Sequence, residues 1–251
     1  MAERVQESLA RQQAFVSDAA HELRSPLTGT RLRIEMLKDY SDTENQVVKE
    51  YLDQSLRDMD YLQRLVGHLL TLSSLDQSQQ LPSLDIDLAP LLYELADEMD
   101  LLFQTAGLAF NVDVPPHLPV MAANPEAMRM AVRNLLDNAI QYKQPGGSVT
   151  LHADSLDGTI RIAVSDHGQG IPPKDIPYVF ERFYRVDKAR SRRQGGAGLG
   201  LSLVRTITES YGGRVAVESK LDEGTTFTIS LPTRAKPAMA MREGSLASRR
   251  S

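Results

Sequence analysis

The sequence predicts a chain in two parts, an all-α helical hairpin followed by a larger unit of mixed strands and helices. Apolar residues recur at helical spacing up to about residue 75, whereas short alternating runs separated by glycine turns prevail after residue 83. A chain of 251 residues with 41% hydrophobic residues can form two domains of ordinary size. We therefore predict a helical domain at residues 1–76, a linker at 77–83, an α/β domain at 84–233 and a disordered tail at 234–251.

The first predicted helix spans residues 3–40 and carries a histidine beside a carboxylate. Its apolar residues recur every four positions: Phe15, Ala19, Leu23 and Leu27. His21 and Glu22 therefore point outward from a buried stripe. Pro26 bends the helix one turn after His21, because an interior proline removes a backbone hydrogen bond. This placement suits a histidine that a reactant must reach, although a solvated His-Glu pair is the plainer reading of these two residues alone.

The second predicted helix begins at a capping box and ends near Leu75. Ser41 is the N-cap, and Glu44 three positions later completes the box. Apolar residues then repeat at intervals of seven, as in a coiled coil: Leu52, Met59 and Val66, and also Leu62 and Leu69. Because one hairpin cannot bury these seams alone, we predict a homodimer in which two hairpins form a four-helix bundle. The alternative is that the stripes pack against the rest of the same chain.

The second unit is predicted from helix caps and strand patterns. Asn124 followed by Pro125 is typical of a helix start, and this helix runs to about Tyr142. Another helix spans residues 199–211 and ends at two glycines, while Asp157-Gly158 indicates a hairpin turn. The predicted strands are residues 108–114, 148–153, 159–165, 214–219 and 225–231.

Composition and missing motifs narrow the function. A net charge of -5 and a pI near 5.6 give no general reason to expect nucleic-acid binding. The chain has no cysteine, which excludes disulfides and thiolate metal sites, and no apolar run near the twenty residues of a membrane span. Neither a P-loop nor a dinucleotide-binding glycine fingerprint occurs, and the His21 segment lacks the second histidine of a zinc-protease helix.

Two polar patches of the second unit suit a ligand. Asn134 and Asn138 are four apart, so one helix face aims both amide oxygens at one point, as a hydrated Mg²⁺ requires. Asp166 follows a strand directly, and the glycines at 168 and 170 let the backbone approach a ligand closely. Taken alone, such asparagines are usually surface residues and such glycines usually form turns.

Arginines and glycines form two further patches. The segment 180–185 precedes a basic loop that could clamp phosphate or simply be solvated: Lys188, Arg190, Arg192 and Arg193. Residues 195–201 are rich in glycine and lead into a helix whose N-terminal amides favour anions.

In this order the patches resemble the cytoplasmic catalytic portion of a bacterial two-component sensor histidine kinase. Residues 21–27 look like the H box, 134–138 like the N box, 166–170 like the G1 box, 180–185 like the F box and 196–200 like the G2 box. The resemblance covers roughly residues 5–233. It implies that the second unit is an α/β sandwich of the GHKL (Bergerat) type that binds ATP and Mg²⁺.

The resemblance also implies roles for single residues. His21 is the phosphoacceptor, Glu22 orients its ring and takes its proton, and Ser25 occupies the place where the family usually has Thr or Asn to position water for dephosphorylating the regulator. Asn138, helped by Asn134, holds Mg²⁺. The other implied ATP-binding residues are Tyr142, Lys143, Asp166, Gly168, Gly170, Arg182, Arg185, Gly196, Gly198, Leu199, Gly200 and Thr225.

Within that set, Asp166 accepts from the adenine amino group, Tyr142 lies against the base or sugar, and Thr225 closes the pocket. Arg182 and Arg185 neutralise the phosphates, and Gly196, Gly198 and Gly200 form the ATP lid. Three positions depart from the family. Gln141 stands where the family commonly has Lys, Ser25 replaces the commoner Thr, and Asp222 stands where Gly is frequent.

The implied partners are a second copy of the chain and a response-regulator receiver domain, whose aspartate takes the phosphoryl group. We expect the regulator to dock around residues 30–38 and the start of the second helix. The implied location is the cytoplasmic side of a protein anchored in the bacterial inner membrane, with no contact of this chain with membrane or nucleic acid. Two alternatives stay open: an ATP-hydrolysing relative, for which Asn134 lacks the basic carboxylate, and a non-catalytic dimeric scaffold.

Overall fold

The computed structural model describes residues 19–20, 23–24, 26–37, 46–76, 83–186 and 197–233. Several predicted features lie outside these ranges: His21, Glu22 and Ser25, the capping box 41–44, the linker residues 77–82, the basic loop positions 188–193, Gly196 and the tail 234–251.

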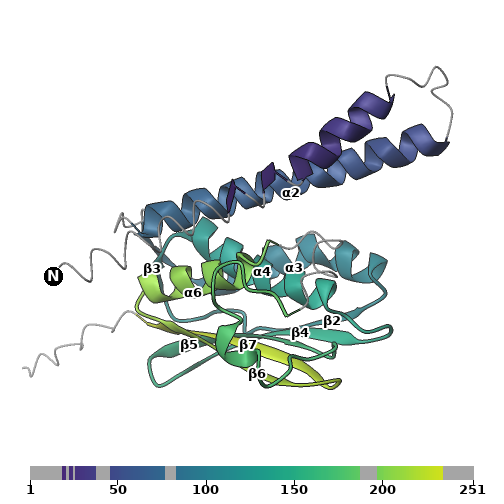
Figure 1. The fold of residues 1–251 in the computed structure, drawn as a ribbon. Coiled ribbons are helices and arrows are strands. Elements are labelled where there is room, and N and C mark those ends of the chain that lie inside the picture. Colours follow the sequence, from purple (N-terminus) through teal and green to yellow (C-terminus); the bar gives the residue numbers. More distant parts are fainter. Residues whose placement is uncertain are drawn as a thin grey trace, which may run out of the picture.

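The helical part is the predicted hairpin. Residues 26–37 are helical and run alongside helix α2 (Gln46–Asp76) (Figure 1). Helix α2 confirms the predicted second helix, which was expected to end near Leu75. The two helices are joined by polar side chains, because the guanidinium of Arg33 binds the carboxylate of Asp58 and its Nε donates to Ser55 Oγ at 3.3 Å. Thr30 Oγ1 donates to the same carboxylate at 3.3 Å. These contacts fix the register of the hairpin.

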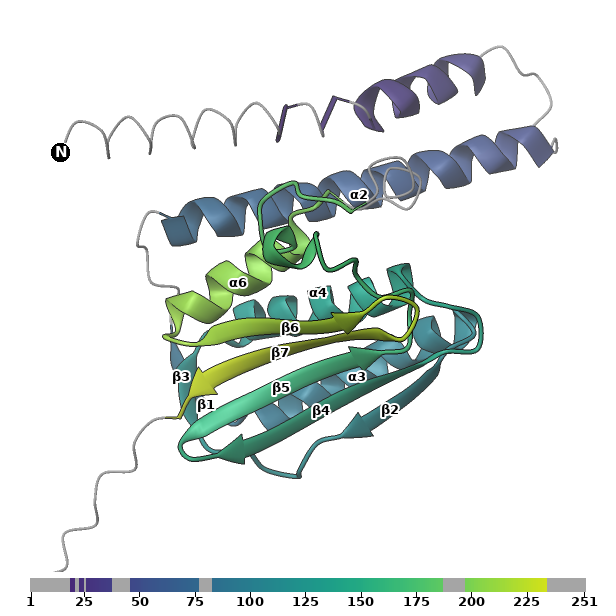
Figure 2. The ribbon, with the colours of Figure 1, turned by 60° about the horizontal axis from the view of Figure 1, so that its bottom comes forward.

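The second unit is a five-stranded sheet with helices packed on one face, which confirms the predicted α/β sandwich (Figures 1 and 2). The strand order is β2-β4-β5-β7-β6, with β2 parallel to β4 and the other pairs antiparallel. The strands are β2 (Ala109–Asp113), β4 (Ser148–Leu156), β5 (Thr159–Asp166), β6 (Arg214–Lys220) and β7 (Gly224–Pro232). The helices are α3 (Leu88–Thr105), α4 (Pro125–Gln141) and α6 (Gly200–Ser210).

The local signals that predicted α4 and the hairpin turn have the expected geometry. Asn124 caps α4 by accepting from Ala127 N, 3.0 Å away. Asp157 and Gly158 both have positive φ, 50° and 74°, as a two-residue type I′ turn between β4 and β5 requires. Gly212, at φ 71°, follows the C-cap of α6.

Residues 84–107 carry no predicted element, yet the structure has a strand and a long helix there. Strand β1 (Leu84–Ile86) pairs with β3 (Met121–Ala123) in a small separate sheet, and Asp87 caps α3 by accepting from Ala89 N at 2.9 Å. The helix buries an apolar stripe: Leu88, Leu92, Leu95, Met99 and Phe103. The aspartate cap and this spacing are the signals that would have identified the helix.

Helix α2 divides its apolar residues between two surfaces. Leu65 and Leu72 are buried in the same core as the sheet and its helices, with Tyr61 and Leu69 packed against them, and α2 crosses over α6 (Figure 1). A second stripe of α2 is exposed: Leu52, Leu56, Met59, Val66 and Leu70. The predicted seam is therefore split, because Leu69 packs within the chain whereas Leu52, Met59 and Val66 face outward. No helix among the described residues is long and apolar enough to cross a membrane.

Candidate functional site

The predicted N box lies on the face of α4 that meets the start of α6. Asn134 Nδ2 donates to the carbonyl of Met130 at 2.8 Å, which fixes the orientation of its amide. A Cβ on Gly200 would lie 2.7 Å from Asn134 Oδ1, so a larger residue at the start of α6 would displace the Asn134 amide. Asn138 lies one turn after Asn134 on α4, as its spacing predicts. Amide oxygens of this kind suit a Mg²⁺ ion that keeps most of its waters.

Asp166 lies at the end of β5, where three elements meet. Its carboxylate accepts from the backbone amide of Gly168 at 2.8 Å and from that of Thr225 on β7. Burial raises the pKa of Asp166, although these two amides and nearby His167 act in the opposite direction. A partly buried carboxylate whose position is fixed by backbone donors is well suited to accept a hydrogen bond from a ligand.

Glycines around Asp166 allow close contacts between backbones. A Cβ on Gly168 would lie 2.6 Å from both Asp166 Oδ1 and the carbonyl of Tyr142, which brings the end of α4 to this site. A Cβ on Gly170, at φ 67°, would lie 2.1 Å from the carbonyl of Lys220. Gly224 is not among the predicted site residues, although a Cβ there would lie 1.9 Å from the carbonyl of Asp166. Its place next to the predicted Thr225 was the available signal.

The turn between β6 and β7 contains Asp222, which stands where the family frequently has Gly. Asp222 has φ 61°, the left-handed conformation that glycine adopts freely and that aspartate tolerates better than most residues. Its amide donates to the carbonyl of Gln169 at 2.8 Å. Thr225 is buried and lies opposite Asp166 in the register of β5 and β7. The predicted Thr225 therefore lies directly beside Asp166.

The F box and the described part of the G2 box are in contact. The amide of Phe183 donates to the carbonyl of Gly198 at 2.8 Å, and Phe183 itself has φ 61°, which is strained for a bulky residue. Gly198 has φ 71°, and a Cβ there would lie only 2.8 Å from the carbonyl oxygen of Tyr184, so the site has no room for a side chain. Leu199 is fully buried, and Arg182 and Arg185 are partly buried. The structure thus joins residues 180–185 to residues 198–200.

The C-terminal end of α4 separates two neighbouring side chains. Lys143 extends to the end of α3, where its ammonium donates to the carbonyl of Ala106. The structure therefore does not bring Lys143 to Asp166. Gln141 is only partly buried as a residue, yet its Nε2 is shielded from solvent and has no hydrogen-bond partner. Tyr142 closes the helix, with its amide donating to Asn138 O at 3.0 Å.

His21, Glu22 and Ser25, the residues predicted to act in phosphoryl transfer, lie outside the described residues. Their neighbour Ala19 is buried, and Leu23 packs against the core. A charge interaction also joins the helical part to α4. Burial raises the pKa of Asp137, while the positive charges of Arg133 and of Arg64 on α2 lower it. No group of three His, Cys, Asp or Glu side chains suited to a metal occurs among the described residues.

The structure is an α/β sandwich attached to a helical hairpin, and comparisons with known proteins assign a family to both parts. Residues 123–235 match the family model described as histidine kinase-, DNA gyrase B- and HSP90-like ATPase. Residues 11–78 match the His Kinase A (phospho-acceptor) domain.

Three proteins illustrate the similarity. SenX3 of Mycobacterium tuberculosis, a sensor-like histidine kinase, is 35% identical over 219 residues, 87% of this chain and 53% of that protein. The solved mycobacterial sensor histidine kinase MprB is 30% identical, with a TM-score of 0.50, over 61% of this chain and 98% of that one. Full-length ShkA, solved with AMPPNP, is 28% identical, with a TM-score of 0.64, over 90% of this chain and 47% of that one.

The chain belongs to the sensor histidine kinase family, and it spans about half the length of the curated relatives that it matches.

Proposed function

We propose that this chain transfers the γ-phosphoryl group of ATP to His21 and then to an aspartate of a response regulator. The observation that carries the proposal is the meeting of four boxes, distant in sequence, around Asn134 and Asp166. Gly200 touches Asn134, Gly168 touches Asp166, and Phe183 binds Gly198. The AMPPNP bound to the similar protein ShkA supports a nucleotide as the ligand.

The proposed ATP site assigns one task to each group of residues. Asp166 accepts from the adenine amino group, Tyr142 lies against the base, and Thr225 closes the pocket beside Asp166. Asn138 and Asn134 hold Mg²⁺, which, when bound, neutralises charge on the phosphates. The remaining proposed ATP-binding residues are two arginines, the glycines of the G1 box and the lid segment: Arg182, Arg185, Gly168, Gly170, Gly196, Gly198, Leu199 and Gly200. Lys143 is left out of this set because its ammonium binds Ala106.

In the proposed reaction, a ring nitrogen of neutral His21 attacks the γ-phosphorus as the bond to the ADP oxygen breaks. Glu22 orients the ring and takes the proton that the imidazole loses, since only an uncharged ring nitrogen is nucleophilic. Transfer to the regulator then exchanges the N–P bond for an acyl phosphate on its aspartate. Ser25, in the position of the usual Thr, is the proposed group for positioning water in a phosphatase reaction.

We propose two protein partners, a second copy of the chain and the receiver domain of the regulator. The exposed apolar stripe of α2 supports the homodimer, because apolar residues at coiled-coil spacing are normally covered. The regulator docks on residues 30–38 and the start of α2. The larger protein is anchored in the bacterial inner membrane, with this portion on the cytoplasmic side.

Incubation of the chain with Mg²⁺ and γ-labelled ATP tests the reaction, with His21→Gln as the comparison. Label that is acid-labile and alkali-stable in the wild type, and lost in the variant, is the expected result, because a phosphoramidate has this stability. ATP binding without labelling would favour the scaffold alternative. Label retained in His21→Gln would assign the acceptor to another residue, and release of inorganic phosphate without labelled protein would favour hydrolysis.

A further inference from the structure

Asp175 is a buried carboxylate that the proposed function does not use. It lies between the G1 box and the F box and is only 8% exposed. Its Oδ1 accepts a hydrogen bond from the hydroxyl of Tyr184 at 2.7 Å, whereas Oδ2 is shielded from solvent and has no partner in the part of the chain that the structure describes. A buried carboxylate with one oxygen unpaired is costly, so an apolar residue of the same shape would suit the fold better. Stability alone therefore does not account for an aspartate at this position.

The backbone around Asp175 is held on both sides. Its amide donates to the carbonyl of Pro172 at 2.9 Å, and its carbonyl accepts from the amide of Tyr178 at 3.0 Å. Just before this turn, the amide of Ile171 donates to Ser219 Oγ on β6 at 2.8 Å, which attaches the segment to the sheet. The carboxylate of Asp175 therefore fixes its partner relative to the sheet.

Tyr184 lies in the F box, next to a residue with a strained backbone. Phe183 has φ 61°, and its amide donates to the carbonyl of Gly198 in the G2 box at 2.8 Å. Such a conformation persists only where neighbouring contacts hold it. The side chain of Tyr184 supplies two of them, because its ring lies 5.6 Å from that of Tyr178 and its hydroxyl binds Asp175. This hydrogen bond raises the pKa of Tyr184, so the hydroxyl stays protonated and remains the donor.

We propose that Asp175 is a positioning residue for phosphoryl transfer, which acts on the F box through the hydroxyl of Tyr184. This inference rests on the proposed function. Arg182 and Arg185 flank the stretch of backbone that Tyr184 holds, so this contact also sets where the two guanidinium groups begin. Charge that develops on the phosphates during transfer is stabilised best by groups that are already in place. Loss of the hydrogen bond should therefore slow the transfer itself and have little effect on MgATP binding.

Rates of His21 labelling over a range of MgATP concentrations test this role in the wild type, Tyr184→Phe, Asp175→Leu and the double variant. Tyr184→Phe removes only the hydroxyl, and leucine has the branched shape of aspartate without its charge. Each single substitution should lower the maximal rate about tenfold, as for a lost hydrogen bond to a charged group, and change the half-saturating MgATP concentration by less than about twofold. The double variant should be no slower than the slower single variant, because both substitutions remove the same hydrogen bond.

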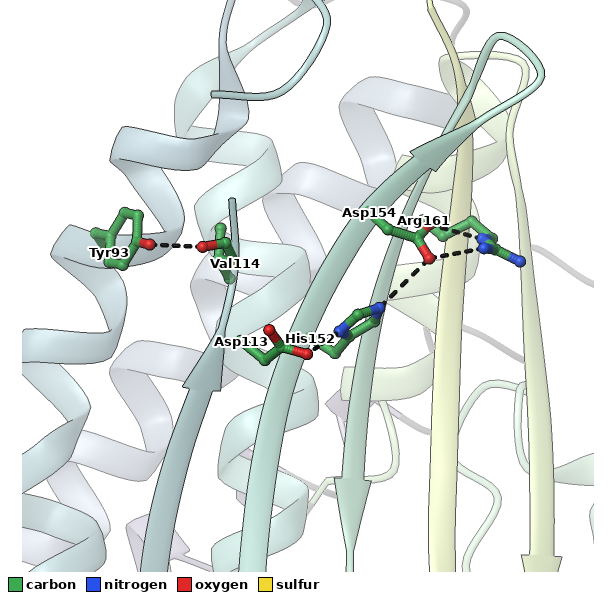
Figure 3. A network of polar contacts seen from close by, with 6 residues as sticks. All are labelled: Tyr93, Asp113, Val114, His152, Asp154 and Arg161. Atoms are coloured by element: carbon green, nitrogen blue, oxygen red, sulfur yellow. Dashed lines mark hydrogen bonds and ion pairs between the residues drawn. The ribbon is translucent and has the colours of Figure 1, made fainter. Parts of the chain in front are cut away.

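Further measurements separate positioning from stability. Asp175→Asn keeps an acceptor for the hydroxyl and should restore at least part of the maximal rate. The free energy of unfolding of the double variant, measured with urea, should equal or exceed that of the wild type, because the buried carboxylate is gone. Tyr93→Phe is the matched control, since it removes the hydrogen bond of a tyrosine hydroxyl on α3 to the carbonyl of Val114, 2.6 Å long (Figure 3). It should leave the maximal rate unchanged.

An unchanged maximal rate in both Tyr184→Phe and Asp175→Leu would overturn the role of Asp175 while leaving the proposed function intact. Losses that multiply to about a hundredfold in the double variant would mean that the two residues act separately, which also overturns it. A wild type that is not labelled on His21 would overturn the proposed function, and this inference with it.

Discussion

Asn134 and Gly200 are in contact where α4 meets α6, because a Cβ at Gly200 would lie only 2.7 Å from Asn134 Oδ1. The same asparagine is held by its hydrogen bond to the carbonyl of Met130. A side chain at Gly200 must therefore displace the amide of Asn134 before it disturbs any backbone. The start of α6 and the proposed Mg²⁺ site are in this way coupled through one side chain.

Gly200→Ala should weaken MgATP binding more than it weakens the fold. The added methyl group pushes Asn134 off its position, whereas alanine is a better helix former than glycine. We expect MgATP affinity to fall about tenfold, as for a lost hydrogen bond to a charged group, with the melting temperature within a few degrees of the wild type. Titration calorimetry and thermal unfolding measure the two effects.

Gly67→Ala on α2 is the matched control, because a Cβ at Gly67 would meet no atom within 4 Å. It should raise stability by about 0.5–1 kcal/mol without changing MgATP affinity. Equal effects of the two substitutions on affinity would argue against a role for the contact between Gly200 and Asn134.

Gly224→Ala should be far more destabilising than Gly200→Ala. Gly224 has φ 128°, and its Cβ would lie 1.9 Å from the carbonyl oxygen of Asp166, a backbone atom that cannot move without parting β5 from β7. We expect a loss above about 3 kcal/mol in the free energy of unfolding, measured with urea.

Gly107→Ala separates steric contact from backbone strain in that experiment. Gly107 has φ 70° but a Cβ there would meet nothing within 4 Å, so only the left-handed conformation is penalised. It should cost about 1 kcal/mol. A similar cost at Gly224 would mean that β7 can shift away from Asp166.

Asp166→Asn should reduce ATP affinity by at least about tenfold while the domain stays folded. The asparagine oxygen can still accept from the amide of Gly168, but its NH₂ group opposes the amino group of adenine. MgGTP, whose base carries a carbonyl at that position, should not lose affinity. Asp157→Asn in the β4–β5 turn, where asparagine is equally suited, is the control. Equal losses for ATP and GTP would place Asp166 away from the base.

Two histidines should give the stability of the chain opposite pH dependences. Burial lowers the pKa of His68 on α2 from 6.5 to about 4, assisted by the charge of Arg64. The unfolded chain then binds more protons than the folded chain between these pH values, so stability should rise from about pH 4 to pH 6.5. His68→Gln should flatten this part of a profile of unfolding free energy against pH.

His152 affects the stability of the chain above pH 6.5. Its ring lies between the carboxylates of Asp113 on β2 and Asp154 on β4, at 2.7 and 3.4 Å, with Arg161 of β5 on the far side of Asp154 (Figure 3). Burial opposes protonation of the ring, but the two carboxylates outweigh burial and raise the pKa of His152. Its contribution is complete below the ordinary pKa and is lost as the pH rises through the raised pKa.

The loss above pH 6.5 should stay below about 1 kcal/mol, because the pair is near the surface. His152→Gln should remove this decrease and leave the acidic part of the profile unchanged. A decrease that persists in His152→Gln would assign the alkaline loss of stability to another group.

Leu56→Asp should shift the chain from dimer to monomer. Leu56 is 59% exposed in the single chain and lies within the outward stripe of α2. If this stripe is the dimer seam, dimerisation would bury the introduced carboxylate, which is strongly unfavourable. Sedimentation velocity over a range of concentrations measures the association. Leu101→Asp on α3 is the control, since that leucine is 69% exposed and lies outside the stripe. Equal association of the wild type and Leu56→Asp would exclude this face as the dimer seam.

Local signals in the sequence were sufficient for much of the fold, whereas the residues of the candidate site were predicted from the resemblance to a known family. The Asn124 cap, the Asp157-Gly158 turn and the heptad spacing act over a few residues, so they predicted α4, the β4–β5 hairpin and α2. The helix α3 was missed although its cap, Asp87, and its apolar stripe follow the same rules. The order of the boxes predicted that Asn134, Asp166 and Gly198 belong to one site.

Other properties depend on contacts between segments far apart in sequence, and only the tertiary structure decided them. The parallel pairing of β2 with β4, the packing of Leu65 on the core and the contact of Gly224 with Asp166 are of this kind. Lys143 and Gln141 are two residues apart on the chain, yet one binds the end of α3 and the other faces inward without a partner. A helix turns by about 200° over two residues, so neighbours in sequence meet different surroundings.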